Sequence, residues 1–231
     1  MLEGLKRIVV ITGHYGSGKT NLAVNLALES RRAGEEVVLA DLDIVNPYFR
    51  SADFSELMEM EGIELVAPIY AGSNLDIPAL TARLDALLDS DRRVIIDVGG
   101  DDAGAAALGR YSAMIEAAGG CDMLYVVNGY RYLTRSAGEA EEILEEIERA
   151  ARLRASAVVN NSNLAGETTA QDIADKAGFA KQVAESYHLP LLCHTAQEDI
   201  AEEVKMLLPG ETVCPVRIYV KKLWEKAFES H

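Results

Sequence analysis

Short apolar runs alternate along the chain with longer stretches that have helical periodicity. The runs are nearly continuous rather than alternating between apolar and polar residues, which is typical of strands buried on both faces of a parallel sheet. They occupy residues 7–12, 36–41, 63–68, 92–97, 123–128, 155–160 and 190–194. Helical patterns occupy residues 18–33, 76–90, 104–118, 133–153, 169–187 and 197–208. This order predicts an α/β fold with a doubly wound, mostly parallel sheet flanked by helices.

The size of the chain limits the number of domains. With 231 residues and 49% hydrophobic composition, it can form one full-sized α/β domain but is too short for two. No linker, repeat or low-complexity tract divides the sequence, so we expect one domain over residues 1–231. The acidic run at 138–152 has its apolar residues on one helical face, and we interpret its acids as a solvated outer surface.

Charge and cysteine content restrict the partners and the location. The formal net charge of −15 disfavours general nucleic-acid binding and binding to anionic membranes. Cys121, Cys193 and Cys214 are far apart and form no CxxC pair, which is typical of reduced thiols. The N-terminal segment leads directly into the first apolar run, and no run is long enough to span a membrane. We therefore expect a cytoplasmic protein.

The segment GHYGSGKT at residues 13–20 lies between the first predicted strand and the first predicted helix. It fits the phosphate-binding loop pattern G-x-x-x-x-G-K-[ST] in both residues and context. Gly16 and Gly18 allow a tight turn that brings backbone N–H groups against phosphate oxygens. Lys19 would contact the β- and γ-phosphates, and the Thr20 hydroxyl would bind Mg²⁺. The predicted nucleotide-binding residues of this loop are Gly13, His14, Tyr15, Gly16, Ser17, Gly18, Lys19 and Thr20.

Acidic residues follow two of the predicted strands. Asp41 and Asp43 close the second strand region, and Asp97 ends the strand at 92–97. The carboxyl ends of parallel strands meet at the edge of the sheet where ligands bind, and strand alternation sends Asp41 and Asp43 to the same side. We therefore predict that Asp41, Asp43 and Asp97, together with Thr20 of the loop, form a Mg²⁺–nucleotide site.

Together these motifs resemble the MinD/ParA/CobQ group of P-loop ATPases, which are relatives of the nitrogenase iron protein. The resemblance covers most of the chain and rests on ITGHYGSGKTNLAVNLAL, VVLADLDIVNPYFRSAD, VIIDVGGDDAG and AVVNNSN, in the family's order. It implies that Asp43 orients or activates the attacking water, that Asp41 lies in the shell around Mg²⁺, and that Asp101 lies near the γ-phosphate. The catalytic residues implied are Lys19, Asp43 and Asp101.

The resemblance also bears on the base and on metal chemistry. Asn160, at the end of AVVN, matches the family's purine-contacting asparagine, and Asn161 could trade places with it. A buried amide there can pair with adenine through both a donor and an acceptor. The chain has no NKxD-type guanine-binding motif, so ATP is favoured over GTP. The iron protein's cluster-ligating cysteine would fall at Gly104, so an Fe–S cluster is not supported.

One position departs from the family's pattern. The family's loop has a second lysine directly after its first glycine, and that lysine reaches the nucleotide of the partner subunit in a dimer. Here the position is His14, followed by Tyr15. Three alternatives stay open: His14 substitutes across the dimer, the dimer is built and triggered differently, or His14 faces solvent.

The resulting functional hypothesis is a nucleotide-dependent switch: a slow Mg²⁺-dependent ATPase that forms a homodimer and presents two surfaces to an unknown protein partner. The segment NPYFRS at 46–51 is a candidate partner surface, although Tyr48 and Phe49 could instead pack under the loop. The first alternative is an ATP-dependent small-molecule kinase or ligase of the dethiobiotin synthetase or cobyrinate amidation type. A third is a metallocentre-maturation ATPase, which needs exposed Cys or His ligands at a dimer interface.

The C-terminal segment at 218–231 has one apolar helical face and several lysines. In MinD-like proteins a short basic helix at this end lies on membranes. Here the segment is short and the rest of the chain is acidic, so we expect it to dock on the domain rather than on a membrane.

Overall fold

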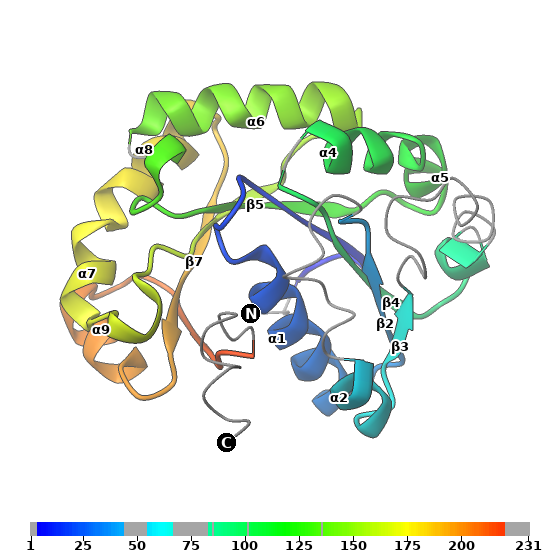
Figure 1. Ribbon diagram of the computed structural model, residues 1–231, viewed down its shortest axis with the longest axis horizontal. Helices are drawn as coiled ribbons and strands as arrows, with labels where there is room; N and C mark the ends of the chain where they lie inside the picture. The colour runs from blue at the N-terminus through cyan, green and yellow to red at the C-terminus, as the bar shows by residue number, and fades with distance from the viewer. Residues whose placement is uncertain are drawn as a thin grey trace, which may run out of the picture.

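A parallel β-sheet runs through the molecule, and helices cover both of its faces (Figure 1). The computed structural model describes residues 4–43, 55–66, 83–84, 86–100, 102–134 and 136–219. Within these residues the sheet has eight strands in the order β3-β2-β4-β1-β5-β6-β7-β8, and every strand pair is parallel. The α/β fold with a doubly wound, mostly parallel sheet flanked by helices is therefore confirmed.

The strands lie close to the predicted runs, usually one or two residues shorter. They are β1 (Ile8–Thr12), β2 (Val37–Asp41), β3 (Glu64–Val66), β4 (Arg93–Asp97), β5 (Asp122–Val127), β6 (Ala157–Asn160), β7 (Leu191–Gln197) and β8 (Val213–Val216). The end of the predicted strand at 63–68 lies outside the described residues. Successive side chains of β1 enter opposite cores: Ile8 and Val10 pack on one face of the sheet, Val9 and Ile11 on the other. A strand buried on both faces needs apolar residues throughout, which explains the continuous runs.

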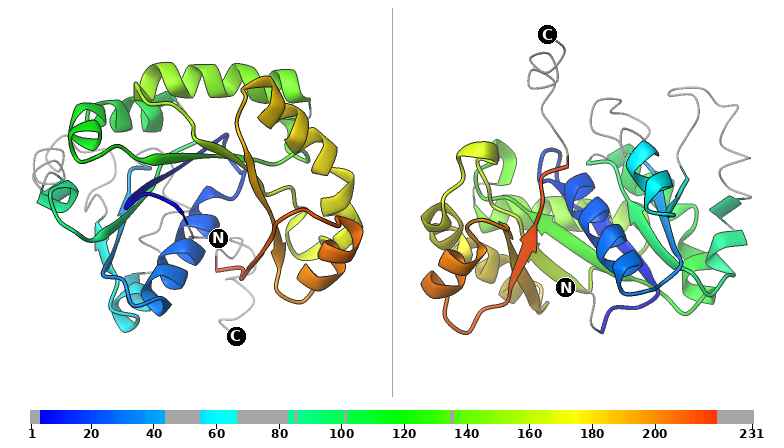
Figure 2. Two further views of the ribbon diagram at one scale, coloured as in Figure 1. Left: turned by 180° about the vertical axis from the view of Figure 1, so that it is seen from behind. Right: turned by 90° about the horizontal axis from the view of Figure 1, so that it is seen from below.

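The helices form two layers and an end group. They are α1 (Lys19–Arg32), α2 (Ser55–Met60), α4 (Asp102–Gly109), α5 (Ser112–Ala117), α6 (Ala137–Ala151), α7 (Ala170–Asp175), α8 (Ala177–Ser186) and α9 (Ala201–Leu207), with 3₁₀ turns η2 (Tyr132–Thr134) and η3 (Ala165–Glu167). The helices α4, α5, α6 and α8 cover one face, and α1 and α2 cover the other (Figures 1 and 2). The pair α7 and α9 packs beside β7 and β8.

Two of the predicted helices are each divided in the structure. The pattern at 104–118 forms α4 and α5, because the chain leaves the helix after Gly109 and the Ser112 hydroxyl donates to the Gly109 carbonyl at 3.0 Å. The pattern at 169–187 forms α7 and α8, which meet at Lys176 with φ −100° and ψ 2°. The Lys176 ammonium lies 4.8 Å above the Tyr130 ring, a cation–π contact that holds the junction. Helical periodicity continues through both junctions, so the pattern alone predicts one helix in each case.

Two short elements were not predicted. The strand β8 has four residues and includes Pro215, which has no backbone N–H to donate. Because β8 is at the edge of the sheet, a proline is tolerated there, although it removes the strand signal from the sequence. The helix α2 is similarly short, with six residues. The predicted helix at 76–90 is described only in part, and residues 83–84 and 86–88 are helical.

The C-terminal region reaches α1 before the described residues end. The backbone N–H groups of Arg217 and Tyr219 donate to the side chains of Asn25 and Asn21 at 2.9 and 2.8 Å. The predicted helix at 218–231 lies outside the described residues from 220 onward. Within the described ranges, no helix combines the length and the apolar character needed to cross a membrane.

One acid of α6 is buried, although the sequence suggested that all of them face solvent. Glu148 is only 7% exposed, while Leu144 and Ile147 enter the core as predicted. Its carboxylate accepts a hydrogen bond from the buried backbone N–H of Ala155 at 2.9 Å and pairs with Arg154. The carboxylate therefore fixes the turn that joins α6 to β6.

This contact predicts a specific loss of stability. The Glu148→Ala variant leaves the buried N–H of Ala155 without an acceptor, which costs about 1–3 kcal/mol. The control is Glu146→Ala, because Glu146 is exposed on the same helix and has no side-chain hydrogen bond among the described residues. Urea denaturation should show a lower midpoint for the Glu148 variant and an unchanged one for the control. Equal midpoints for both variants would contradict this role.

Candidate nucleotide site

The loop at residues 13–18 leaves the carboxyl end of β1 at the point where the sheet changes direction. The chain passes from β1 to β2 on one side and later from β4 across β1 to β5 on the other. The ends of parallel strands at such a reversal form the crevice in which α/β proteins bind ligands. The structure therefore brings the predicted loop to the expected edge of the sheet.

The backbone of this loop is strongly curved. Gly16 and Gly18 have φ values of 75° and 89°, in the left-handed region that residues with a Cβ rarely adopt. Gly18 is also the N-cap of α1, and no side chain caps the helix there. The first turn of α1 therefore directs its backbone N–H groups and the positive end of its dipole into the loop, as anion binding requires.

Lys19 lies across the loop. Its side chain is buried, and Nζ donates a hydrogen bond to the His14 carbonyl at 3.0 Å. Gly100 lies close to the Lys19 ammonium and to the backbone of Tyr15: a Cβ at Gly100 would lie 2.9 Å from Lys19 Nζ and 2.6 Å from the Tyr15 backbone. The segment after β4 thus packs directly on the loop and on the ammonium group.

Two side chains from neighbouring strands hold the outer side of the loop. Asn161, after β6, donates from Nδ2 to the Ser17 carbonyl at 2.6 Å, and Arg131, after β5, donates from Nε to the Gly16 carbonyl at 2.8 Å. In a planar trans peptide the carbonyl and the following N–H point in opposite directions. Holding the Ser17 carbonyl toward Asn161 therefore turns the Gly18 N–H to the other side of the loop. Neither Arg131 nor this role of Asn161 was predicted from the sequence, because both depend on strand order.

The two predicted carboxylates meet beside the loop. Asp41 and Asp97 end neighbouring strands and are paired in register, with exposed fractions of 0% and 1%. The Asp41 carboxylate accepts the backbone N–H of Asp43 at 2.8 Å, which directs the chain after β2. The Asp43 side chain lies against Gly99, where a Cβ would be 3.1 Å from Oδ1. Asp101, the fourth predicted acid, lies outside the described residues.

These donors fit a magnesium ion held with phosphate. Mg²⁺ is usually bound by one or two carboxylates together with phosphate oxygens and waters rather than by an all-protein cage. Asp41 and Asp97 supply adjacent buried carboxylates, and Thr20 lies in the first turn of α1. No group of three or more His, Cys, Asp or Glu side chains within the described ranges could hold a metal alone. The set Thr20, Asp41 and Asp97 therefore suits Mg²⁺ with a nucleotide better than a structural metal.

His14 and Tyr15, in place of the lysine and glycine of the family pattern, differ in exposure. The Tyr15 ring is half exposed, whereas His14 is partly buried with Nδ1 at 3.0 Å from the Tyr15 carbonyl. Burial lowers the pKa of His14, and the positive charge of Lys19 lowers it further, against the hydrogen bond to Tyr15. His14 therefore carries no fixed positive charge at neutral pH, unlike a lysine.

Asn160, the predicted base contact, is fully buried at the end of β6, with 0% exposure. Its Nδ2 lies 2.8 Å from His194 Nδ1, and its Oδ1 accepts from the backbone N–H and hydroxyl of Ser162 at 3.1 and 2.7 Å. The amide thus organises the loop after β6 in this structure. A base contact through Asn160 requires one of these hydrogen bonds to be exchanged.

His194 was not identified from the sequence. Its ring is completely buried on β7, and burial lowers its pKa despite the nearby Glu211 carboxylate, which lies 3.6 Å from Nε2. A neutral ring can accept the Asn160 hydrogen bond at Nδ1. The histidine therefore supports the loop after β6.

The three cysteines are free thiols. Cys193 on β7 and Cys214 on β8 are buried and share a hydrogen bond that raises the pKa of Cys193. Burial raises the pKa of Cys121 to about 11. These thiols are poor candidates for the exposed ligands that a metallocentre-maturation role needs.

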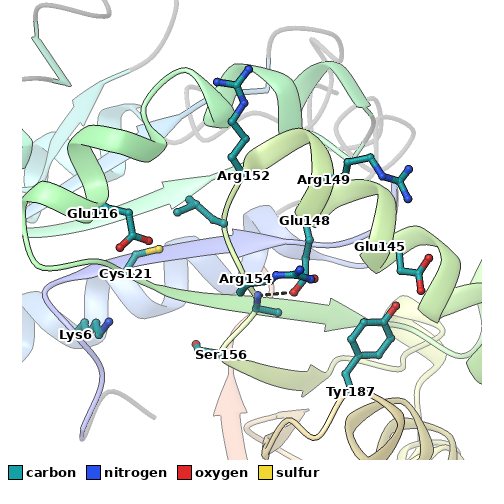
Figure 3. Close-up of a pocket in the computed structure, with 12 residues that line it drawn as sticks. Lys6, Glu116, Cys121, Glu145, Glu148, Arg149, Arg152, Arg154, Ser156 and Tyr187 are labelled. Carbon is teal, nitrogen blue, oxygen red and sulfur yellow. Dashed lines mark hydrogen bonds and ion pairs between the residues drawn. The ribbon is translucent and has the colours of Figure 1, made fainter.

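A separate cavity of about 850 Å³ lies away from the loop (Figure 3). It opens at the amino ends of β5 and β6, and its lining includes Lys6, Cys121 and Glu148. In a parallel sheet the amino and carboxyl strand ends lie at opposite edges. The predicted nucleotide-binding residues therefore do not line this cavity.

Gly104, at the position of the iron protein's cysteine, leaves no room for a side chain. A Cβ at Gly104 would lie 2.7 Å from the Gly99 backbone. A cysteine at this position would require α4 or the segment after β4 to move.

Comparison with known proteins identifies the fold through structure rather than sequence. No protein-family model matches the chain, and no curated protein matches it. Solved structures do match. FtsY from Mycoplasma mycoides has a TM-score of 0.59 and 17% identity, and the match covers 85% of this chain and 61% of FtsY.

Two further structures give the same result. Cell division protein FtsY from Thermotoga maritima has a TM-score of 0.56 and 21% identity, over 83% of this chain and 62% of that chain. The signal recognition particle 54 kDa protein from Aeropyrum pernix K1, solved in complex with GDP, has a TM-score of 0.54 and 21% identity, over 81% and 40%. The chain thus spans less than two thirds of the length of these proteins. At these identities the likeness concerns the fold alone, and this chain shares its α/β fold with these proteins.

Proposed function

We propose that this protein is a P-loop ATPase of the MinD/ParA type that binds Mg·ATP and acts as a nucleotide-dependent switch, as a homodimer with a protein partner. One observation carries the proposal: a curved glycine loop, a buried lysine and two buried carboxylates converge at one edge of the sheet. Buried carboxylates side by side are unfavourable without cations, which Lys19 and Mg²⁺ would supply.

The chemistry of such a site depends on positioning and charge. The loop N–H groups and Lys19 would bind the β- and γ-phosphates, and Thr20, Asp41 and Asp97 would hold Mg²⁺ around them. Mg²⁺ would neutralise the charge that develops on the phosphates. Asp43 would orient the attacking water, and Asp101 would stand as a second polar group near the γ-phosphate.

The contact of Asp43 with Gly99 supports the switch proposal. Gly99 and Gly100 form one short segment that touches Asp43 on one side and Lys19 on the other. A γ-phosphate bound to Lys19 would therefore act on both segments at once. Loops that order on the γ-phosphate and relax after hydrolysis give two surfaces for a partner.

The choice of base depends on the side chains at the end of β6 and directly after it. The structural neighbour from Aeropyrum pernix was solved with GDP, so guanine is the competing choice. A guanine site commonly uses a carboxylate to accept the base N–H groups, whereas residues 160–163, at the end of β6 and directly after it, are Asn, Asn, Ser and Asn. Amides suit adenine, and we keep Asn160 as the proposed contact.

Nucleotide binding should depend on Lys19. The Lys19→Ala variant loses a charge-assisted hydrogen bond to phosphate, about 1.5–3 kcal/mol, which corresponds to roughly a 10- to 150-fold loss of ATP affinity. Calorimetric titration with Mg·ATP measures the loss, and Lys205→Ala on α9 is the control, because among the described residues Lys205 forms a surface ion pair with Glu202. Unchanged affinity in the Lys19 variant would rule out the phosphate-binding role of the loop.

Turnover should depend on Asp43 more than binding does. A group that orients the water acts mainly in the transition state, so Asp43→Ala should keep ATP affinity and lower turnover by about 100-fold. Phosphate release is measured without any added acceptor, with Asp89→Ala as an exposed acidic control. Wild-type turnover in the Asp43 variant would move this role to Asp101. ATP binding without phosphate release by the wild type would favour a kinase or ligase.

The preference for adenine should depend on Asn160. We expect ATP to bind more tightly than GTP, and Asn160→Ala to reduce that difference, because the proposed amide contacts favour adenine. Competition titrations of both nucleotides on the wild type and the variant give the ratio. A melting curve of the variant is the control, since Asn160 also supports the loop after β6. Equal affinities for the two nucleotides in the wild type would argue against adenine specificity.

A further inference from the structure

Arg131 extends from the loop after β5 onto the phosphate-binding loop. Its Nε donates to the Gly16 carbonyl at 2.8 Å. A Cβ at Gly16 would lie 3.3 Å from Nε and 3.4 Å from Cζ of Arg131. The guanidinium therefore packs on Gly16 where a side chain at this position would project. An arginine more than a hundred residues away in sequence is therefore part of the wall of the loop.

The backbone that carries Arg131 is held in place. Its N–H donates to the carbonyl of Asn128 at 3.0 Å, and the Thr134 hydroxyl donates to the same carbonyl at 2.7 Å. Asn128 is fully buried at the end of β5, and its Oδ1 accepts the N–H of Tyr130 at 3.0 Å. The position of the arginine is therefore set by the sheet rather than by a long exposed loop.

Most of the guanidinium is still available. Arginine has five N–H donors in a rigid fork, and the bond to Gly16 uses one of them. Among the described residues, no other hydrogen bond or ion pair of the Arg131 side chain is found. Arg131 is an exposed residue beside the loop. A fork of this kind matches the oxygens of a phosphate group.

A bound triphosphate would bring more negative charge to the loop than Lys19 alone can balance. The position that carries a second lysine in the family's pattern is His14, so Lys19 is the only fixed cation within the loop. A bound nucleoside triphosphate brings several negative charges to the loop. A second cation on the rim of the same subunit would stabilise them without a residue from a partner subunit.

We propose that Arg131 is a phosphate-binding residue that contacts the β- or γ-phosphate of the nucleotide held in its own subunit. This inference rests on the proposed function and adds a residue that acts in cis. The simpler alternative is that Arg131 only holds the Gly16 carbonyl, as Asn161 holds the Ser17 carbonyl. Asn161 carries no charge, so it offers a direct comparison for the two roles.

The test compares Arg131→Ala, Arg131→Lys and Asn161→Ala, with Arg149→Ala as an exposed arginine at the other edge of the sheet. Binding of inorganic tripolyphosphate with Mg²⁺ is measured by calorimetry at low and high salt. Phosphate release from ATP without an acceptor is measured in parallel, and melting curves identify variants that do not fold.

We expect Arg131→Ala to weaken tripolyphosphate binding and to lower turnover at saturating ATP, each at least tenfold. The loss in binding should shrink as salt rises, since salt screens a charge contact near the surface. Arg131→Lys should recover part of the loss, because it keeps the charge but not the fork. Arg149→Ala should stay within twofold of the wild type.

Two results would overturn the proposal. One is tripolyphosphate binding and turnover by Arg131→Ala within twofold of the wild type. The other is a loss no larger than that of Asn161→Ala and independent of salt, which would make Arg131 a support of the loop only. If Lys19→Ala abolishes turnover while Arg131→Ala changes neither tripolyphosphate binding nor turnover, this inference fails and the proposed function stands. If tripolyphosphate binding depends on Arg131 but ATP releases no phosphate, the ATPase proposal fails and Arg131 keeps its role.

Discussion

The parallel pairing of β4, β1 and β5 is the constraint on which the candidate site depends. Because all three strands run in the same direction, their carboxyl ends meet at one edge of the sheet. The glycine loop leaves β1 there, the Asp97 carboxylate ends β4, and the turn that carries Arg131 follows β5. β2 adds Asp41 in register with Asp97. Residues from distant parts of the sequence are therefore neighbours for a single geometric reason.

The segment after β4 can approach the glycine loop and Asp43 closely because its residues there are glycines. The segment after β4 lies against the loop, Lys19 and Asp43, and side chains at Gly99 or Gly100 would collide with them. Packing of this kind couples the segments, since none can move far without displacing another. The same closeness would let a bound phosphate influence two segments together. This is the physical basis of the proposed switch.

The outer supports of the loop divide into charged and uncharged groups. Asn161 and Arg131 both donate to loop carbonyls, yet only the arginine carries charge beyond the bond that it makes. Burial lowers the pKa of His14, so it does not supply the fixed cation that the family pattern places at this point. The proposed role for Arg131 follows from this distribution of charge. In this role Arg131 would bind the phosphate of its own subunit and would need no residue from a partner subunit.

The sequence by itself determined the fold class, the position of most strands and the place of the glycine loop between β1 and α1. These follow from local signals: continuous apolar runs, a glycine pattern between a strand and a helix, and acids after strands. Only the tertiary structure decided the breaks at Gly109 and Lys176, the proline-containing β8 and the buried Glu148. The break at Gly109 and the burial of Glu148 rest on hydrogen bonds to nearby residues, Ser112 and Ala155. The contact at Lys176 comes from the distant Tyr130, and β8 depends on its position at the edge of the sheet. The contact of Arg131 with the loop belongs to this second group, because strand order places β5 beside β1 and periodicity along the chain carries no information about strand order.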